Sequence, residues 1–269
     1  MSAIEATDGS GRSVPEGRRA RVRRETLAEL KRATLEEIRA TGAVGLSLRS
    51  VARRMGMSPA GLYRYVDSRE ALLTLLIADG YHDLGHHLEV ALGAPAGRGG
   101  VDDRPLPAPP MVAGEDADVA DRLRAVARTY RSWSVTHPGE FGLLFGDPIP
   151  GYAAPEGGPT VEGMTRMGSA LGRPLLEAYR QGRLRLHPAH ATPELVARLG
   201  PMEHLVGDLP LELSALLLLA WGRLHGQVSL EVFGHHHWLF PEGCEQLFDA
   251  DLEAMLLDLG IAPAPGAGA

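Results

Sequence analysis

The stretch SLRSVARRMGMSPAGLYRYVDSR, residues 47–69, holds two short helical patterns separated by a tight turn. In the first pattern, over 48–55, apolar residues recur at helical spacing on one face, and Ser47 can cap its start. Gly56 follows, where a helix commonly ends in a left-handed residue. The second pattern covers 59–66. Two short helices joined by a turn of about three residues that contains glycine predict a helix-turn-helix.

The second of these helices carries its own start signals. Ser58 can cap it, and Pro59 occupies the first helical position, where the N–H that proline lacks would have no helical partner. Leu62 and Val66 then point toward a core. The opposite side is mostly small, which lets such a helix enter a DNA major groove closely. The residues on that side are Pro59, Ala60, Gly61, Tyr63 and Arg64.

Longer helices flank the helix-turn-helix on both sides. One is predicted over 23–40 with a stop at Gly42, and another from near Ser68 toward Leu92. The apolar positions of the earlier helix share one face: Leu27, Leu30, Leu35 and Ile38. We therefore expect a three-helix head over 18–70.

Four features of this head occur together in one order. They are Ala-x-x-x-Gly at 52–56, the Ser-Pro entry at 58–59, Leu-Tyr-x-Tyr-Val at 62–66, and Arg69 before Glu-Ala-Leu-Leu at 70–73. In these features, residues 24–75 resemble the TetR family of bacterial transcriptional regulators, and the resemblance is far looser beyond them. An isolated helix-turn-helix has many false positives, whereas one with flanking helices in the expected order has few.

The resemblance implies which residues contact DNA. Arg49 would contact a base or a phosphate from the first helix of the motif. The family reads bases at the positions of Pro59, Ala60 and Gly61, and holds phosphates at those of Tyr63, Tyr65 and Arg69. Here positions 59–61 carry no polar side chain, so direct base readout would rely on Arg49, Ser58 or Arg64.

Charge is unevenly distributed along the chain. The net charge is −7, yet residues 16–70 hold thirteen Lys or Arg against seven Asp or Glu, while residues 71–269 hold thirteen against twenty-five. A basic head on an acidic body confines affinity for phosphate to one end. The arginines expected before the first helix could reach a minor groove or the DNA backbone, or belong to a solvated, disordered arm over 1–17. They are Arg18, Arg19, Arg21, Arg23 and Arg24.

Composition indicates a cytoplasmic protein. Of the 269 residues, 44% are hydrophobic, and the single cysteine, Cys244, rules out an intramolecular disulfide and suits a reducing compartment. The N-terminal residues show no apolar signal region. The longest apolar run, Leu213–Trp221, is far shorter than the ~20 residues that a membrane span needs.

The remainder, 71–260, is predicted to be a helical effector-binding and dimerisation body. It is interrupted by a Gly- and Pro-rich flexible loop over 93–114 and followed by a disordered tail over 261–269. Without an alternating strand pattern, the fold class is all-α. Helices are expected at Val119–Val135, Val161–Arg183, Pro193–Leu199, Leu211–Phe233 and Gly243–Leu259.

One segment of the body resembles a subgroup of the family named for a Trp-His-Gly signature, which Trp221, His225 and Gly226 carry here. His225 lies one turn from Trp221, which favours a core histidine over a ligand-binding one. An apolar effector pocket of the size usual for small molecules, ~300–1,000 Å³, could form among the middle helices, although the same residues could simply fill the core. The candidate pocket residues are Trp133, Phe141, Phe145, Met164, Met167, Tyr179 and Trp221.

The last two long helices look like a helical hairpin with broad apolar stripes. The family builds its dimer from such a pair as a four-helix bundle, and symmetric DNA sites require a two-fold protein. The alternative is that both helices pack only within their own subunit. The candidate interface residues are Leu213, Leu216, Leu217, Ala220, Leu252, Met255, Leu256 and Leu259.

Several histidines are candidate ligands for a metal ion. His82 and His86 are four residues apart, a spacing found in metal sites, and His87 and 235–237 add more imidazoles. Because no cysteine or carboxylate cluster completes a site in the sequence, we predict no metal and no cofactor. We expect Cys244 to be a packing residue rather than a redox switch.

The resemblance as a whole implies a homodimeric regulator that binds a double-stranded DNA operator and is not an enzyme. We expect a repressor released by a small-molecule effector. Two alternatives stay open: an enzyme with an all-helical body and a basic extension, and a DNA-binding activator without ligand response. No nucleophile elbow, phosphate loop or HExxH motif supports the enzyme.

Overall fold

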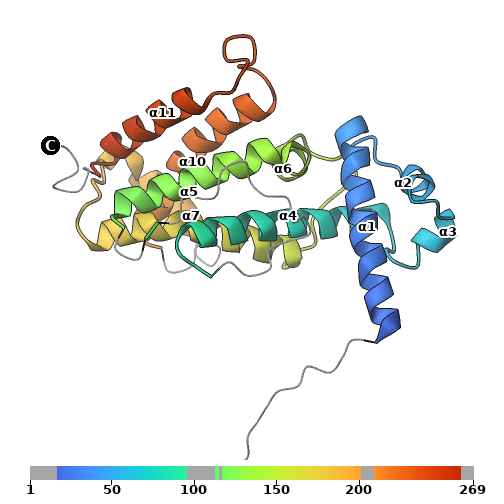
Figure 1. Ribbon diagram of the computed structural model, residues 1–269. Coiled ribbons are helices and arrows are strands. Elements are labelled where there is room, and N and C mark those ends of the chain that lie inside the picture. The colour runs from blue at the N-terminus through green and yellow to red at the C-terminus, as the bar shows by residue number, and fades with distance from the viewer. Residues whose placement is uncertain (1–16, 96–112, 115–116, 201–208, 262–269) are drawn as a thin grey trace, which may run out of the picture.

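A computed structural model of the protein describes residues 17–95, 113–114, 117–200 and 209–261, and within these ranges it is helical without strands (Figure 1). The predicted all-α class is therefore confirmed. The helices are α1 (Arg18–Thr41), α2 (Leu48–Arg54), α3 (Pro59–Leu62), α4 (Arg69–Ala91), α5 (Val119–Thr136), α6 (Pro138–Phe145), α7 (Pro159–Arg180), α8 (Pro193–Leu199), α10 (Leu211–Val232) and α11 (Glu245–Asp258), with a 3-10 turn at Pro188–His190.

The head consists of α1, α2, α3 and the start of α4. Figure 1 shows α1 crossing the end of α4, with α2 and α3 at the extremity of the molecule farthest from α11. Leu30 from α1, Val51 from α2 and Leu62 from the end of α3 are buried together against Leu72 and Leu73 of α4. Burial of a leucine contributes about 1.5–3 kcal/mol, so this small core holds the three short elements in place.

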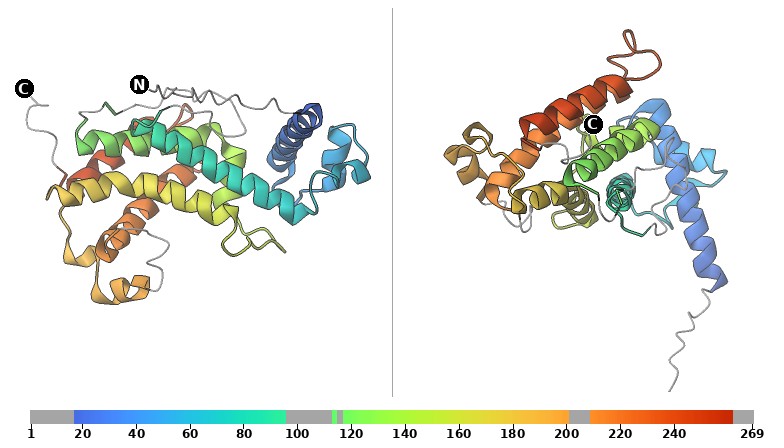
Figure 2. Two further views of the ribbon diagram at one scale, coloured as in Figure 1. Left: turned by 90° about the horizontal axis from the view of Figure 1, so that it is seen from below. Right: turned by 60° about the vertical axis from the view of Figure 1, so that its left-hand side comes forward.

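In the body, α5 and α7 pack against the rest of α4, α10 packs against α5 and α7, and α11 packs against α5 and α10. Figure 2 shows α4 and α7 side by side along most of their length, and they are the most extensively packed pair of helices. Gly163 permits this approach, since a Cβ there would lie 2.8 Å from the Cβ of Tyr81. Thus α4 belongs to both cores, to the head through Leu72 and Leu73 and to the body through Leu84 and Leu88.

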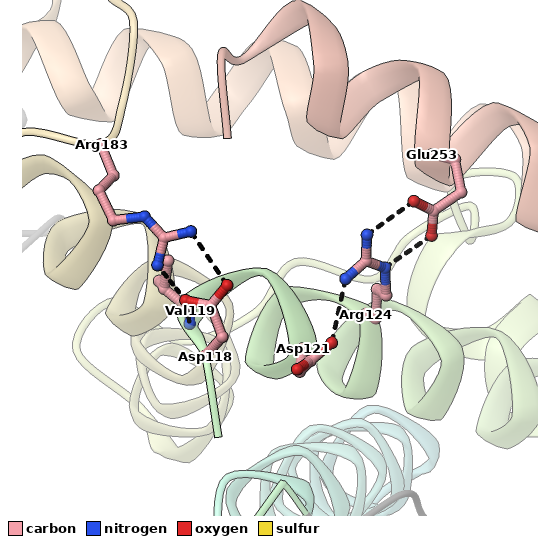
Figure 3. Close-up of polar contacts among 6 residues, drawn as sticks. All are labelled: Asp118, Val119, Asp121, Arg124, Arg183 and Glu253. Atoms are coloured by element: carbon pink, nitrogen blue, oxygen red, sulfur yellow. Dashed lines mark hydrogen bonds and ion pairs between the residues drawn. The ribbon is translucent and has the colours of Figure 1, made fainter. Parts of the chain in front are cut away.

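Arginine–carboxylate pairs fasten the outer helices of the body to α5 (Figure 3). Asp118 caps α5 by accepting from the N–H of Val119 at 2.7 Å and also pairs with Arg183, just beyond α7. Arg124 binds both oxygens of Glu253 on α11, each at 2.7 Å. These charge-assisted bonds are stronger than neutral ones because both partners are ionised.

Several helix boundaries differ from those expected. Helix α1 begins at Arg18 rather than Arg23, so the arginine stretch lies inside the helix and not before it. Helix α3 ends at Leu62 rather than at residue 66, because the chain continues in tighter turns, with the N–H of Tyr65 bonded to the carbonyl of Leu62. Ser47 stands at the cap position of α2, but its side chain makes no capping bond.

The body also departs from the prediction at two places. Helix α6 was not expected, since its eight residues include Pro138 and two glycines and show too few turns for a periodic pattern. Ile261, assigned to the tail, is buried in the body core, so the body extends at least one residue further. Most of the predicted arm, flexible loop and tail lies outside the described residues. Of those described, no helix combines the length and the apolar character needed to cross a membrane.

Candidate nucleic-acid interface

The turn between α2 and α3 has the conformation that its residues predict. Gly56 has φ +65°, the left-handed region that favours glycine, and thereby lets the chain leave α2 sharply. Ser58 then caps α3, because its hydroxyl oxygen accepts from the N–H of Gly61 at 3.1 Å, and Pro59 takes the first helical position. The prediction of a helix-turn-helix is confirmed in these local details.

Helix α3 turns one side to the head core and the other to solvent. Leu62 and Val66 are almost completely buried. On the outer side, Tyr63 is 53% exposed. We call this outer side the recognition face; its other residues are Ser58, Pro59, Ala60, Gly61 and Arg64, all exposed except the half-buried Gly61. The face therefore lies open, as a helix that enters a major groove must.

Three predicted DNA contacts from three different helices border one open hollow of about 550 Å³. Arg49 comes from α2, Tyr63 from the end of α3 and Arg69 from the start of α4. Arg69 has a role that the sequence did not reveal: its Nη2 and Nε donate to the carbonyls of Ala43 and Leu46, at 2.9 and 3.2 Å. These bonds hold the connection between α1 and α2, so Arg69 positions the first helix of the motif.

A second hollow, of about 420 Å³, lies between the start of α1 and the turn after α3. Arg18, Arg19 and Arg23 border it together with Arg64 and Tyr65. Arg23 donates to the carbonyl of Arg64 at 3.0 Å, and its guanidinium lies 5.5 Å from the centre of the Tyr65 ring. Arg18, Arg19 and Arg23 of α1 therefore form one basic surface with Arg64 of the recognition face.

The hydroxyl of Tyr65 lies at the inner edge of this surface. Hydrogen bonds with Thr26 and, second, with Arg64 lower the pKa of Tyr65 below its ordinary value. A phenol oxygen held in this way is fixed in position, which suits the predicted phosphate contact geometrically.

The positive charge of the head is left uncompensated mainly on this surface. Lys31, Arg39 and Arg54 pair with carboxylates, two of them in the body, Asp79 and Glu140. In contrast, within the described parts of the chain no acidic side chain forms an ion pair with Arg18, Arg19, Arg49 or Arg64. Charge of one sign on one face raises the local concentration of a polyanion.

The seven candidate pocket residues do not line one cavity. Trp133, Phe141 and Met167 are buried in the core, Phe145 and Trp221 are half-buried, and Met164 and Tyr179 are exposed. Among them, the rings of Phe141, Phe145 and Trp221 pack against one another, and their role in effector binding stays a prediction. An apolar cavity between α5, α7, α10 and α11 measures only about 40 Å³, and Trp221 is the one candidate that borders it.

His225 lies at the centre of this aromatic packing. Its ring stacks on Trp221 at 5.0 Å and on Phe141 at 5.5 Å between ring centres. Its Nδ1 lies 2.7 Å from the hydroxyl of Tyr130 and its Nε2 3.2 Å from that of Ser229. Burial lowers the pKa of His225 and favours the neutral ring. The interpretation as a core histidine with satisfied hydrogen bonds is confirmed.

Five of the eight candidate interface residues are buried inside the protomer, and their role in a dimer interface stays a prediction. Helices α10 and α11 turn the buried side chains among them inward, into the core of the body. The buried ones are Leu213, Leu216, Leu252, Leu256 and Leu259, and the half-buried ones are Leu217, Ala220 and Met255. The large apolar residues that the same two helices expose are Leu218, Leu219, Leu230 and Leu257.

The histidines that the structure describes do not gather into a metal site. In the described ranges no group of three or more His, Cys, Asp or Glu side chains could hold a metal ion. His86 and His87 pack edge to face. Cys244 is 3% exposed and burial raises the pKa of its thiol, which supports a packing role. That the protein needs no metal stays a prediction.

Helix α6 connects the head to the body, which sequence reasoning missed. Glu140 accepts two bonds from Nη2 of Arg39 on α1, at 2.9 and 3.0 Å, and Leu143 is buried in the head core. Phe141 and Phe145 face the opposite way, into the aromatic packing around His225. Arg39 and Glu140 are 101 positions apart, so no local signal could have paired them.

Comparisons with known proteins agree with this geometry. A family profile described as bacterial regulatory proteins of the tetR family matches residues 30–84, and one described as a tetracyclin repressor-like C-terminal domain matches residues 123–255. The HTH-type transcriptional regulators Rv1816 of Mycobacterium tuberculosis and Mb1846 of Mycobacterium bovis are each 32% identical over 227 residues, covering 82% of this chain and 86% of theirs.

Solved structures share the fold. The regulatory protein SCO4313 has a TM-score of 0.66 at 29% identity and covers 90% of this chain and 99% of its own. A bacterial regulatory protein in the tetR family from Rhodococcus RHA1 has a TM-score of 0.57 at 15% identity, covering 89% and 99%. With profiles matching head and body and relatives aligned over most of their length, the chain belongs to the tetR family of bacterial regulatory proteins and is a DNA-binding transcriptional regulator.

Proposed function

We propose that the protein is a homodimeric repressor that binds a two-fold symmetric operator and is released from it by a small-molecule effector. The observation that carries the proposal is the open recognition face beside uncompensated arginines, on a head whose core shares α4 with the body. We further propose that it is not an enzyme and acts in the cytoplasm, where bacterial DNA lies. Its body would belong to the Trp-His-Gly subgroup through Trp221, His225 and Gly226.

Contacts to DNA would be divided between positioning and readout. Arg49, Tyr63 and the α1 arginines would bind phosphates and set the register of the head. Ala60 and Pro59 would approach thymine methyl groups, and Arg64 or Ser58 would reach a base edge. One bidentate arginine–guanine pair would supply about 1–3 kcal/mol of discrimination.

Dimerisation would use the outward faces of α10 and α11. On α10, Leu219, Gly222, Gly226 and Leu230 follow one another at helical spacing, and a Cβ added at either glycine would meet no atom within 4 Å. A partner helix could therefore approach this face closely. On α11, Ala250, Ala254 and Leu257 are exposed at the same spacing. Two such helices from each protomer would form a four-helix bundle.

The link between effector and DNA would run through α4 and α6. Both helices contribute to the head core and to the body core. A coupling free energy of roughly 1–3 kcal/mol between the two sites would weaken operator binding about 5- to 150-fold.

Titration of labelled DNA by fluorescence anisotropy tests the DNA-binding part. Fragments flanking the gene of this protein should bind tightly and with strong salt dependence. Arg49→Ala should weaken binding and reduce the salt slope by about one unit, whereas Arg198→Ala, an exposed arginine of α8, should change neither. Binding no tighter than to unrelated DNA would overturn the proposal, and a transcript that rises with added protein would identify an activator instead.

Sedimentation tests the dimer. Leu219→Glu places a charge on the exposed face of α10 and should yield monomers, while Val44→Glu, at an even more exposed apolar position in the head, should leave dimers intact. Dimers that survive Leu219→Glu and Leu257→Glu together would place the interface elsewhere.

A further inference from the structure

A groove lies where the head meets the body, outside the aromatic packing. It is enclosed by α4, α6, the loop that joins α6 to α7, and the first turn of α7, and has a volume of about 380 Å³. That volume falls in the range of small-molecule sites, ~300–1,000 Å³. We call it the junction groove; its walls include Ile77, Tyr81, Leu143, Tyr152, Thr160 and Met164.

The groove is shaped by well-packed elements. The loop joining α6 and α7 runs beside the head end of α4 in Figure 2, and the hydroxyl of Tyr152 on this loop lies 3.1 Å from that of Thr74 on α4. Val161 and Met164 of α7 complete the far side. The walls are thus mainly apolar.

One polar residue that borders the groove has a buried side chain with unmet hydrogen-bonding capacity. Thr160 is 5% exposed, and its hydroxyl finds no hydrogen-bond partner among the residues that the structure describes. A buried hydroxyl without a partner costs about 1–3 kcal/mol, so a ligand group that became its partner would remove this cost. Thr160 also lies in the first turn of a 22-residue helix, where the backbone dipole favours an electronegative atom.

The lining determines the chemistry of the occupant. The apolar walls favour a hydrophobic body, and the hydroxyl of Thr160 favours one hydroxyl, carbonyl or amine group at its end. Asp147 borders the groove with an exposed carboxylate, which disfavours an anionic ligand. A small, uncharged and largely apolar molecule fits all three features.

The position of the groove adds a regulatory consequence. Ile77 and Leu143 belong to the head core, while Met164 belongs to a helix of the body. A molecule that wedges between them would bind one head–body arrangement better than another, and only such differential affinity shifts an equilibrium.

We propose that the junction groove binds the effector, a small uncharged apolar molecule that forms a hydrogen bond with the hydroxyl of Thr160. This inference rests on the proposed function for its regulatory half, whereas binding to the groove can be tested alone. Of the residues expected from sequence to form the effector pocket, only Met164 borders this groove.

The test uses the full-length protein and the neutral fluorescent probe 1-aminoanthracene. Its emission should rise on binding to the wild type. Ala154→Trp fills the groove from its rim and should weaken probe binding at least about tenfold, while Ala153→Trp, an exposed neighbour that does not border the groove, should not. Thr160→Val should weaken binding about 3- to 10-fold, the value of one neutral hydrogen bond.

Thr129→Val is a matched control for Thr160→Val. Thr129 is also buried and its hydroxyl has no partner among the described residues, but it lies in α5 and does not border the groove. It should leave probe affinity unchanged. Failure of the wild type to bind the probe, or equal binding by Ala154→Trp and Ala153→Trp, would overturn the groove as a site. An equal loss of probe affinity in Thr160→Val and Thr129→Val would show that Thr160 does not bind the probe.

A DNA titration with the same variants separates the two proposals. Saturating probe should weaken operator binding by the wild type and not by Ala154→Trp. If the protein binds its operator but the probe has no effect on that affinity, the inference about regulation fails and the DNA-binding proposal stands. If the protein binds the probe in the groove but no operator, the proposed function fails and the site remains.

Discussion

The ion pair between Arg39 and Glu140 offers a sharp test of how the head is held against the body. Nη2 of Arg39 donates to both carboxylate oxygens of Glu140, and the Glu140 side chain is 9% exposed while that of Arg39 is 34% exposed. Exposed pairs contribute about 0.2–1 kcal/mol, and hydrogen bonds to charged groups about 1.5–3 kcal/mol. Because the pair is intermediate in burial, we expect a coupling free energy of about 1–2 kcal/mol.

A double-mutant cycle measures this quantity. The variants are Arg39→Met, Glu140→Gln and the combination, each unfolded with urea at pH 7 to obtain the free energy of unfolding. The exposed pair Arg21–Glu25, at 3.8 Å within α1, provides the control and should couple by less than about 0.5 kcal/mol.

A substitution at Gly139 perturbs the contact between Arg39 and Glu140 without changing any charge. A Cβ at position 139 would lie 2.6 Å from Cγ of Arg39, so Gly139→Ala must displace the arginine and should also lower the free energy of unfolding. A coupling of 0.3 kcal/mol or less between Arg39 and Glu140, within the error of additivity, would refute the reasoning.

Three further predictions concern titration and reactivity. Hydrogen bonds from Arg124 lower the pKa of Glu253. The stability that this pair supplies is therefore present above the ordinary carboxyl pKa, about 4.3, and is lost as the pH falls through the lowered pKa. In Arg124→Met, the free energy of unfolding measured with urea should fall less steeply in acid than in the wild type. Burial lowers the pKa of His225, so as the pH falls below about 6.5 this histidine takes up a proton in the unfolded chain before it does so in the folded protein. The free energy of unfolding should therefore decline between about pH 6.5 and the lowered pKa of the folded protein. The same decline in His225→Gln would contradict this cause. The raised pKa and burial of the Cys244 thiol predict slow reaction with a disulfide reagent at pH 7.5 in the folded protein and fast reaction in urea, and equal rates would disprove the packing role.

The sequence alone determined the local structure of the turn between α2 and α3 and the way α3 begins. The left-handed turn at Gly56, the cap at Ser58 and the inward positions of Leu62 and Val66 all depend on interactions within a few residues, which periodicity and capping rules capture. The sequence also determined that the head is basic and the body acidic, because this follows from where the charged residues lie along the chain.

Tertiary structure alone decided which way the apolar body helices face. Helix α10 is apolar on more than one side, so periodicity could not tell Leu213 and Leu216, which are buried in the protomer, from Leu218 and Leu219, which are exposed. The same limit applied to the aromatic residues, which pack around His225 instead of lining a pocket.

The junction between head and body was likewise invisible in the sequence. Arg69 reaches carbonyls 23 and 26 positions earlier in the chain, and Arg39 pairs with Glu140 across 101. Such contacts arise only when distant segments are packed together, because no short-range preference of the chain encodes them. The groove beside Thr160 is formed by segments just as distant, and it exists only in the folded protein.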